Sequence, residues 1–316
     1  MRLLLFNPDT EYALATGASF YTPPARVAEL ARELQLLPEA WAREDDIILV
    51  EDRTQAESVF RTADWGMLRE IYSCGSLPTP EPWGWNHAVR RRLLDSGVPE
   101  SVLPAVEYID LVRNLAHRRT TIKLNEEWNA TTGEEWKVDL PVELTDEEEC
   151  VAFYRNNPGC WMKAPWSSSG RGVVNTGADM EERHVRPWCR GILRRQGSVI
   201  CETPADRAGD FATEWRIEDG EATYLGLSKF ITSNRGKYIS NSMASQERLE
   251  YEFCDECAFP LEDLRRIQKE ILEETLRGYT GLLGVDMIVE KYGKLRPFVE
   301  INLRRTMGML CLPRVP

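Results

Sequence analysis

The sequence lacks several features on which common classes of protein depend. Only three of its 316 residues are histidine, and no Ser–His–Asp or Cys–His arrangement stands out, so nothing points to a side-chain nucleophile. The eight cysteines follow no regular spacing, which favours reduced thiols over a disulfide framework. The single CxxC, at residues 254–257, has no second pair to complete a structural zinc site.

Long apolar runs and an excess of positive charge are also missing. The apolar start, residues 1–6, ends at Asn7 and Pro8, far short of a membrane span or a signal peptide. Lys and Arg total 39 against 51 for Asp and Glu, a formal net charge of -12, which repels nucleic acids and anionic membranes. We therefore expect a cytoplasmic protein that binds neither, and in which an anionic ligand needs a local basic pocket.

The length and the N-terminal pattern favour an α/β protein of several parts. With 316 residues the chain can form two or three packed subdomains. Apolar runs at residues 3–6 and 47–50 predict strands, and the helical pattern at residues 24–36 lies between them. The intervening loop, residues 7–17, is long and polar. In an open α/β sheet such loops line the ligand crevice, although an ordinary surface loop is an equally good interpretation.

Breaks in the pattern suggest where the parts of the chain meet. Prolines within residues 78–82 are expected to end regular structure, and a helix is predicted over residues 87–96. The polar residues 125–139 are interpreted as a loop. Thr145 and Glu148 form a capping box, which predicts a helix that begins there and runs to about residue 156.

A loop of serine and glycine follows the next predicted strand. Residues 160–165 predict that strand, and residues 166–172 lead into a second strand at Val173. Gly and Ser allow backbone N–H groups to turn onto phosphate oxygens, and Lys163 adds a positive charge beside them. The loop matches neither the P-loop nor the dinucleotide fingerprint. An ordinary turn is the alternative.

Two further strands carry acidic side chains. An amphipathic helix is predicted before them, and the strands are expected at residues 284–290 and 296–302. Glu300 and Asn302 are two residues apart and point to the same face. Asp286 on the paired strand can share that face.

Acidic groups among Val, Ile and Phe are unfavourable unless they bind something positive. Oxygen ligands of this kind suit Mg²⁺, which takes its other ligands from water and phosphates. Arg304 lies two residues beyond Asn302 and is placed to hold a transferring phosphate or an anionic substrate. The alternative is a solvent-facing polar pattern on an edge strand.

Together these two clusters resemble the ATP-grasp fold. The resemblance runs over about residues 105–308 and is strongest at residues 163–173 and 300–304. It implies an α/β fold, with α+β subdomains, in three parts, namely a small N-terminal α/β domain at 1–82, linker helices with the first ATP-grasp subdomain at 83–198, and the second subdomain at 199–316.

The resemblance also implies roles for single residues. Lys163 would contact the α- and β-phosphates, and Glu202 the adenine amino group. Asp210 would bind the ribose hydroxyls, with Glu214 as a rival. The flap over the phosphates would comprise Ser167, Ser168, Ser169, Gly170, Arg171 and Gly172. The implied magnesium ligands are Asp286, Glu300 and Asn302. The implied catalytic residues are Arg304, Lys229 and Arg216. An early basic phosphate contact corresponds to Arg118, Arg119 or Lys123.

The activity that the resemblance implies is an ADP-forming ligase that uses ATP and Mg²⁺. Such an enzyme joins the carboxylate of a small molecule or peptide to an amine through an acyl phosphate. A kinase of the same fold and a nucleotide-binding protein without turnover are the alternatives. Because the sequence stops soon after residue 304, we expect an element that covers the substrate to be either absent or supplied by another chain, for example in a homodimer.

Overall fold

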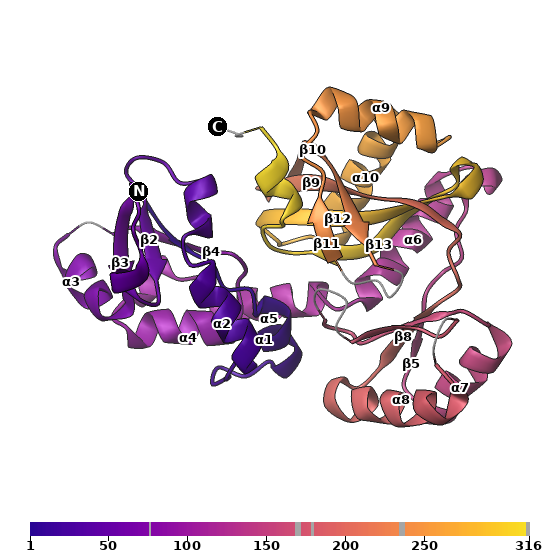
Figure 1. The fold of residues 1–316 in the computed structure, drawn as a ribbon, viewed down its shortest axis with the longest axis horizontal. Coiled ribbons are helices and arrows are strands. Elements are labelled where there is room, and N and C mark those ends of the chain that lie inside the picture. The colour runs from indigo at the N-terminus through magenta and orange to yellow at the C-terminus, as the bar shows by residue number, and fades with distance from the viewer. Residues whose placement is uncertain (76, 168–171, 178–179, 234–237, 314–316) are drawn as a thin grey trace. The chain divides into compact units, whose positions relative to one another are not determined.

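The computed structural model of the chain describes all residues except 76, 168–171, 178–179, 234–237 and 314–316 (Figure 1). It falls into two compact units, Met1–Asn114 and Leu115–Pro316. None of the described helices is both long and apolar enough to cross a membrane. Short 3₁₀ turns lie at Leu37–Ala40, Arg53–Gln55, Trp65–Met67, Glu100–Val102, Glu134–Trp136, Lys291–Gly293 and Gly308–Cys311.

The first unit is built on a parallel sheet with the strand order β3-β2-β1-β4. Its strands are β1 (Arg2–Leu5), β2 (Ile47–Val50), β3 (Arg61–Asp64) and β4 (Thr79–Pro82). Leu3 and Leu5 pack into a core cluster on one face, and Leu4 packs into a second cluster. A parallel sheet that is covered on both faces needs continuous apolar strands, and the two strands predicted from apolar runs are confirmed as β1 and β2.

The prolines of residues 78–82 do not end regular structure, so that prediction is wrong. β4 contains Pro80 and Pro82 and pairs in parallel with β1 at the edge of the sheet. The amides of Thr79 and Trp83 donate to the carbonyls of Met1, just before β1, and Leu5, and the prolines occupy the alternating positions. An edge strand tolerates proline there because the missing N–H would point away from the only neighbouring strand.

Five helices accompany this sheet, namely α1 (Thr10–Thr16), α2 (Ala25–Glu33), α3 (Leu68–Ser73), α4 (His87–Asp95) and α5 (Val106–Leu115). The helix expected over residues 87–96 is α4, and the Asn86 side chain caps it by accepting from the Val89 amide at 2.9 Å. The first unit thus extends past residue 82 to residue 114. The division into three parts stays a prediction.

The second unit contains two antiparallel sheets, with the strand orders β5-β8-β6-β7 and β11-β10-β9-β12-β13. The smaller sheet comprises β5 (Val142–Leu144), β6 (Trp161–Lys163), β7 (Val173–Asn175) and β8 (Val199–Glu202). The larger comprises β9 (Arg207–Glu218), β10 (Glu221–Thr232), β11 (Tyr238–Asn241), β12 (Gly281–Glu290) and β13 (Leu295–Asn302). Both predicted hairpins are confirmed, because β6 pairs with β7 and β12 pairs with β13.

Each of these sheets is covered by a pair of helices (Figure 1). α7 (Glu147–Asn156) and α8 (Glu182–Gln196) pack on the smaller sheet around a core that includes the buried free thiols of Cys150, Cys189 and Cys201. α9 (Gln246–Glu256) and α10 (Leu261–Thr275) cover one face of the larger sheet, where Phe253 and Gln268 contact alternate residues of β9.

Part of the segment interpreted as a loop, residues 125–139, is helical, so that prediction is wrong. α6 (Arg119–Thr131) includes its first half. Leu124 and Trp128 are fully buried on one side of this helix, and Asn125 Nδ2 donates to the Phe298 carbonyl in β13 at 2.8 Å. Tertiary packing of these few side chains outweighs the polar composition of the segment.

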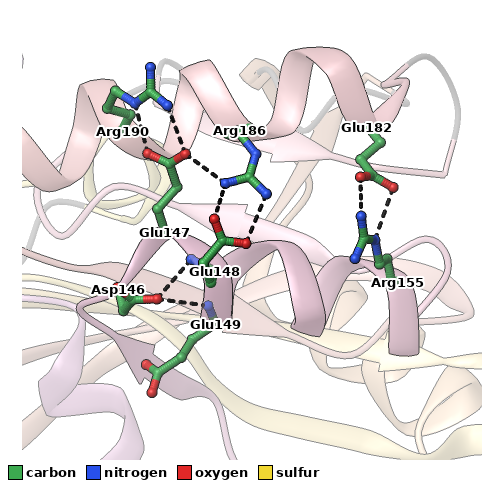
Figure 2. Close-up of polar contacts among 8 residues, drawn as sticks. All are labelled: Asp146, Glu147, Glu148, Glu149, Arg155, Glu182, Arg186 and Arg190. Atoms are coloured by element: carbon green, nitrogen blue, oxygen red, sulfur yellow. Dashed lines mark hydrogen bonds and ion pairs between the residues drawn. The ribbon is translucent and has the colours of Figure 1, made fainter.

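Ion pairs join the two helices of the smaller sheet (Figure 2). Glu147 at the start of α7 binds Arg190 and Arg186 of α8, at 2.7 and 3.0 Å, and Glu148 also binds Arg186. The N-cap is Asp146 rather than the expected Thr145, since its carboxylate accepts from the amides of Glu148 and Glu149. The predicted helix is therefore confirmed, with its start shifted along the chain.

The substitution Glu147→Gln should lower the melting temperature at neutral pH by no more than a few degrees. Hydrogen bonds from Arg190, then Arg186, hold the pKa of Glu147 at about 2, below its ordinary 4.5. A carboxyl group with a lowered folded-state pKa stabilises above its unfolded pKa, and this contribution is lost as the pH falls. Thermal unfolding from pH 7 downwards should show the difference from wild type fading between about 4.5 and 2. A difference that widens in acid contradicts this.

Candidate functional site

Two carboxylates stand side by side on the face of the larger sheet opposite α9 and α10. Asp286 of β12 and Glu300 of β13 are direct cross-strand partners. Asn302 lies one pair further along the same face, and its Nδ2 donates to Asp286 Oδ2 at 3.3 Å. Like charges at this position repel each other, so the pair requires a cation nearby.

Arg118 supplies one such cation from the start of α6. Its guanidinium lies 2.6 Å from Glu300 Oε2 and also donates to the Ala164 carbonyl and to Ser167 Oγ, at 2.9 and 2.6 Å. The side chain is 5% exposed. Of the three basic residues left open by the sequence, Arg118 is the one that reaches the carboxylates, because Arg119 pairs with Glu143 and Lys123 is exposed.

The electrostatics of this face favour uptake of positive charge. Burial, with Glu300 and then Glu214 adding to it, raises the pKa of Asp286 well above its ordinary value. Burial also raises the pKa of Glu214 to about 7, although the Thr306 and Ser228 hydroxyls donate to it. Arg304 partly offsets both carboxylates, and its Nη2 donates to Asn302 Oδ1 at 3.0 Å.

A second buried ion pair lies on the smaller sheet. Lys163 of β6 and Glu202 of β8 are neighbours in adjacent strands, and Lys163 Nζ is 2.6 Å from Glu202 Oε1. Both side chains are largely buried, at 7% and 11% exposed. The lysine therefore adds a buried positive charge to this side of the site, balanced by Glu202.

Asp210 lies at the other end of the acidic face. Its Oδ2 accepts from the Thr232 hydroxyl at 2.7 Å and from Arg207 at 3.1 Å. Burial raises its pKa, while Arg207 acts in the opposite direction. Glu214, its rival in the sequence, is 1% exposed and lies under Thr306 and Ser228.

A cavity of about 100 Å³ lies between the two sheets of this unit. It has apolar walls from both sheets, including Trp161 and Phe230, and a rim of charged residues. The predicted site residues that line it are Lys163, Glu202, Asp210, Asp286 and Glu300, and the further lining residues are Arg118, Trp161, Val173, Ala205, Arg207, Phe230, Thr232, Met287, Ile288, Arg296 and Val299.

Lys229 is not among the residues that line this cavity, although the sequence suggested a place for it there. A β-bulge between Tyr224 and Gly226 shifts the register of β10 by one residue, and such a shift moves every later side chain to the other face. Lys229 therefore faces α9, where it binds Glu252 and Glu256 at 3.0 and 2.7 Å. Phe230 and Thr232 line the cavity in its place.

Arg216 and the serine loop are the remaining predicted residues. Arg216 shares the acidic face but lies beyond Glu214, where it faces Glu218 at 3.7 Å, and it does not line the described cavity. Gly172 has φ +74° and its carbonyl accepts from the Ala164 amide at 2.7 Å. The structure places Ser167 against Arg118. Ser168, Ser169, Gly170 and Arg171 lie outside the described residues.

The donor set fits a magnesium ion. In the part of the chain that the structure describes, no three His, Cys, Asp or Glu side chains form a metal cluster. The converging oxygens come from two carboxylates, Asp286 and Glu300, and the amide of Asn302. A small set of this kind suits Mg²⁺, which keeps several waters and binds substrate phosphates.

Sequence reasoning missed the parts of the site that depend on long-range contacts. Arg207 and Thr232 bind Asp210 from two different strands. The bulge in β10 decides the face of Thr232, and a separate register shift between β9 and β12, at Val289 and Glu290, occurs next to Arg207. Neither irregularity is visible in the local sequence pattern. Trp161 is the exception, since it lies two residues before Lys163 and points to the same face.

Comparison with known proteins gives one relative in sequence. No protein-family model matches the chain. A ligase of Niallia circulans that joins L-glutamate to the butirosin acyl-carrier protein is 27% identical over 213 residues. The matched region is 64% of this chain and 46% of the relative, so the chain spans about half the length of that protein.

Several solved structures share the arrangement of elements. A biotin carboxylase of Campylobacter jejuni, solved as a β,γ-ATP complex, aligns with a TM-score of 0.57 and 13% identity over 96% of this chain and 66% of its own. The ADP complex of N5-carboxyaminoimidazole synthetase from Staphylococcus aureus aligns with a TM-score of 0.52 and 12% identity over 97% and 71%. At such low identity the likeness concerns the fold alone.

The substitution Gly308→Ala should destabilise the protein, because an added Cβ would overlap Glu214 Oε1 and Ser228 Oγ. Both residues are buried, and overpacking of this kind lowers the free energy of unfolding by about 1–3 kcal/mol. The matched control is Gly191→Ala within α8, where a Cβ meets only the flexible end of Arg195 at 3.5 Å. Urea unfolding should give opposite signs, since Ala favours a helix by up to about 1 kcal/mol. Equal stability of Gly308→Ala and wild type contradicts this packing.

Proposed function

Because the chain has the ATP-grasp fold, we propose that it is an ATP- and Mg²⁺-dependent, ADP-forming ligase that joins a carboxylate to an amine. The resemblance drawn from the sequence is thereby confirmed at the level of the fold. The observation that carries the proposal is the convergence of Asp286, Glu300, Arg118 and Lys163 on one cavity. These residues supply the oxygen ligands and the cations that a nucleotide with its metal ion requires.

In this proposal the residues that now form internal ion pairs would contact the nucleotide when it binds. Lys163 would turn from Glu202 to the phosphates, and Glu202 would then accept from the adenine amino group. Trp161 and Phe230 would enclose the base, and Asp210 would accept from the ribose hydroxyls. The cavity of about 100 Å³ is smaller than the roughly 300 Å³ of ordinary ligand sites, so the sheets or these side chains must move apart on binding.

The same residues would position and neutralise the reacting groups. Mg²⁺ held by Asp286, Glu300 and Asn302 would offset the charge of the phosphates. Arg304 beside Asn302 would bind the substrate carboxylate or the transferring phosphate. Arg118 would keep Glu300 ionised and oriented. No protein nucleophile is needed, because the acyl phosphate forms between the two substrates.

The relative in sequence supports a proposal for the substrate class. The Niallia circulans ligase acts on L-glutamate and an acyl-carrier protein, and we extend this to an amino acid or another small acid as one substrate. The amine is then a small molecule, a peptide, or a group carried on a protein. A homodimer and a cytoplasmic location remain part of the proposal.

ATP with Mg²⁺ should raise the melting temperature, and GTP should raise it less, since a ligand that binds only the folded state stabilises it by mass action. Glu300→Gln should remove the Mg²⁺-dependent part of the shift and abolish turnover without unfolding the chain. Glu262→Gln, on an exposed part of α10, is the control and should behave as wild type. Thermal unfolding at millimolar nucleotide measures this, and no shift with ATP argues against a nucleotide site.

Hydroxylamine should trap the acyl phosphate as a hydroxamate when ATP and the correct acid are present, because that intermediate is a strong acylating agent. Arg304→Ala should lower hydroxamate formation by about 10²–10³-fold through loss of a charge-assisted contact. Arg277→Ala, which removes an exposed arginine paired with Glu274, should leave it unchanged. Mass spectrometry of the products reports the outcome.

The trapping experiment also separates the ligase from the kinase alternative. A stable phosphorylated product, with ADP formed and neither hydroxamate nor amide, supports the kinase. Binding of ATP with no ADP formed on any acid or alcohol tested supports a nucleotide-binding protein without turnover.

A further inference from the structure

The first unit contains a cavity of about 680 Å³ that the proposed ATP site does not involve. It lies beyond the carboxyl ends of the parallel strands. Asn7 and Asp9 follow β1, Glu51 follows β2, Trp65 follows β3, and Asn86 follows β4. Its volume falls within the roughly 300–1,000 Å³ of small-molecule sites.

The topology places this cavity where open α/β sheets bind ligands. In the order β3-β2-β1-β4, the chain leaves β1 towards β2 on one side and returns to β4 on the other. The loops after β1 and β4 therefore diverge and leave a crevice between them. Asn7 and Asn86 line the cavity from these two loops. The loop of residues 7–17, one of whose interpretations was a crevice lining, begins at this point.

The charged residues of the cavity leave one anion and one cation unmatched. Arg92 binds Glu51 at 2.7 Å, and Arg91 binds Asp95 at 2.8 Å, so these four neutralise one another.

Asp9 and Arg32 remain. Within the described residues neither forms an ion pair, and the Asp9 side chain makes no cap hydrogen bond to α1. Burial, with Glu11 adding to it, raises the pKa of Asp9. Arg92, which lines the same cavity, acts in the opposite direction on that pKa without a direct ion pair to Asp9, and Arg32 is exposed. Asp9 and Arg32 are thus the charged groups of the cavity that are left for the two ends of a zwitterion.

Two polar groups on the cavity walls have no partner. Tyr21 Oη and Trp65 Nε1 are buried atoms that make no hydrogen bond to any described part of the chain, and both residues line this cavity. Both groups can donate, and a buried donor without an acceptor is unfavourable by about 1–3 kcal/mol. An acceptor on a ligand would remove that penalty. The rings of Phe6 and Phe20 add apolar wall beside them.

We propose that this cavity is a binding site for a zwitterion, either a free amino acid or a short peptide. Its ammonium group binds Asp9, and its carboxylate binds Arg32. Its carboxylate or carbonyl oxygens accept from Tyr21 Oη and Trp65 Nε1. Its apolar side chain packs on the aromatic wall. The site stands on its own residues and does not depend on the ATP site being correct.

Isothermal titration of the full chain tests this with L-phenylalanine, L-leucine, L-glutamate and the dipeptide Phe–Leu as probes. Saturable binding of at least one is expected. A free amino acid that binds more tightly than the dipeptide, or the reverse, identifies which of the two sources the site selects. The N-acetyl form of the bound probe should bind at least about tenfold more weakly, because it has no ammonium group.

The decisive comparison combines the variants with the probes. In Asp9→Asn, binding should weaken about tenfold or more, and acetylation of the probe should have little further effect, because both changes remove the same contact. In Arg32→Gln, binding should weaken by a similar factor, and amidation of the probe's carboxylate should have little further effect, because both changes remove the same contact. Tyr21→Phe removes only the unpartnered hydroxyl and gives a second reading if Asp9→Asn fails to fold. Asp219→Asn, in the turn between β9 and β10, is the matched control.

The outcome is kept separate from the ATP site by measuring the ATP–Mg²⁺ melting shift of each variant. Wild-type shifts in Asp9→Asn, with amino-acid binding lost, support two distinct sites. The proposal is overturned if no zwitterion in the panel binds saturably, if acetylated and free probes bind equally, or if Asp9→Asn and Tyr21→Phe both bind as wild type does.

Discussion

The second unit depends on how it accommodates two carboxylates at adjacent positions of neighbouring strands. Asp286 and Glu300 face each other across β12 and β13, where like charges repel and burial removes the water that would screen them. Arg118 forms an ion pair with Glu300 and also donates a hydrogen bond to the Ala164 carbonyl in the loop after β6. A single guanidinium therefore pairs with a carboxylate of the larger sheet and holds the chain just after β6, an inner strand of the smaller sheet. Among the residues that the structure describes, its buried Nε has no hydrogen-bond partner.

The buried ion pairs of this unit are not explained by stability alone. A buried ion pair that is replaced by apolar residues often leaves a protein as stable or more stable, so stability alone does not account for Lys163 and Glu202 together with Arg118 and Glu300. Both pairs line one cavity. In the function proposed above, phosphates and a metal ion would replace these partners, and the side chains would have to move for that exchange.

The two cavities of the chain differ in their chemistry. In the second unit four acidic and four basic residues line the cavity. Ion pairs already join Lys163 to Glu202, Arg207 to Asp210 and Arg118 to Glu300. In the first unit the cavity lies beyond the carboxyl ends of the parallel strands, and its lining includes three acidic and three basic residues. Two buried donors in its wall, Tyr21 Oη and Trp65 Nε1, have no acceptor within the described residues. Each is formed within its own unit. The first suits a zwitterion and the second a polyanion that brings its own cation.

The sequence determined those parts of the site that rest on local periodicity. Glu300 and Asn302 share a face because alternation within one strand is fixed, and the hairpin of β12 and β13 brings Asp286 to them. Lys163 and the loop after it follow from one hairpin in the same way. The tertiary structure alone decided the rest. The burial of Trp128 stabilises a helix in a segment of polar composition. The edge position of β4 lets a strand contain Pro80 and Pro82. The bulge at Tyr224 and Gly226 directs Lys229 away from the cavity. Burial and register arise from contacts between distant residues, and no local pattern contains them.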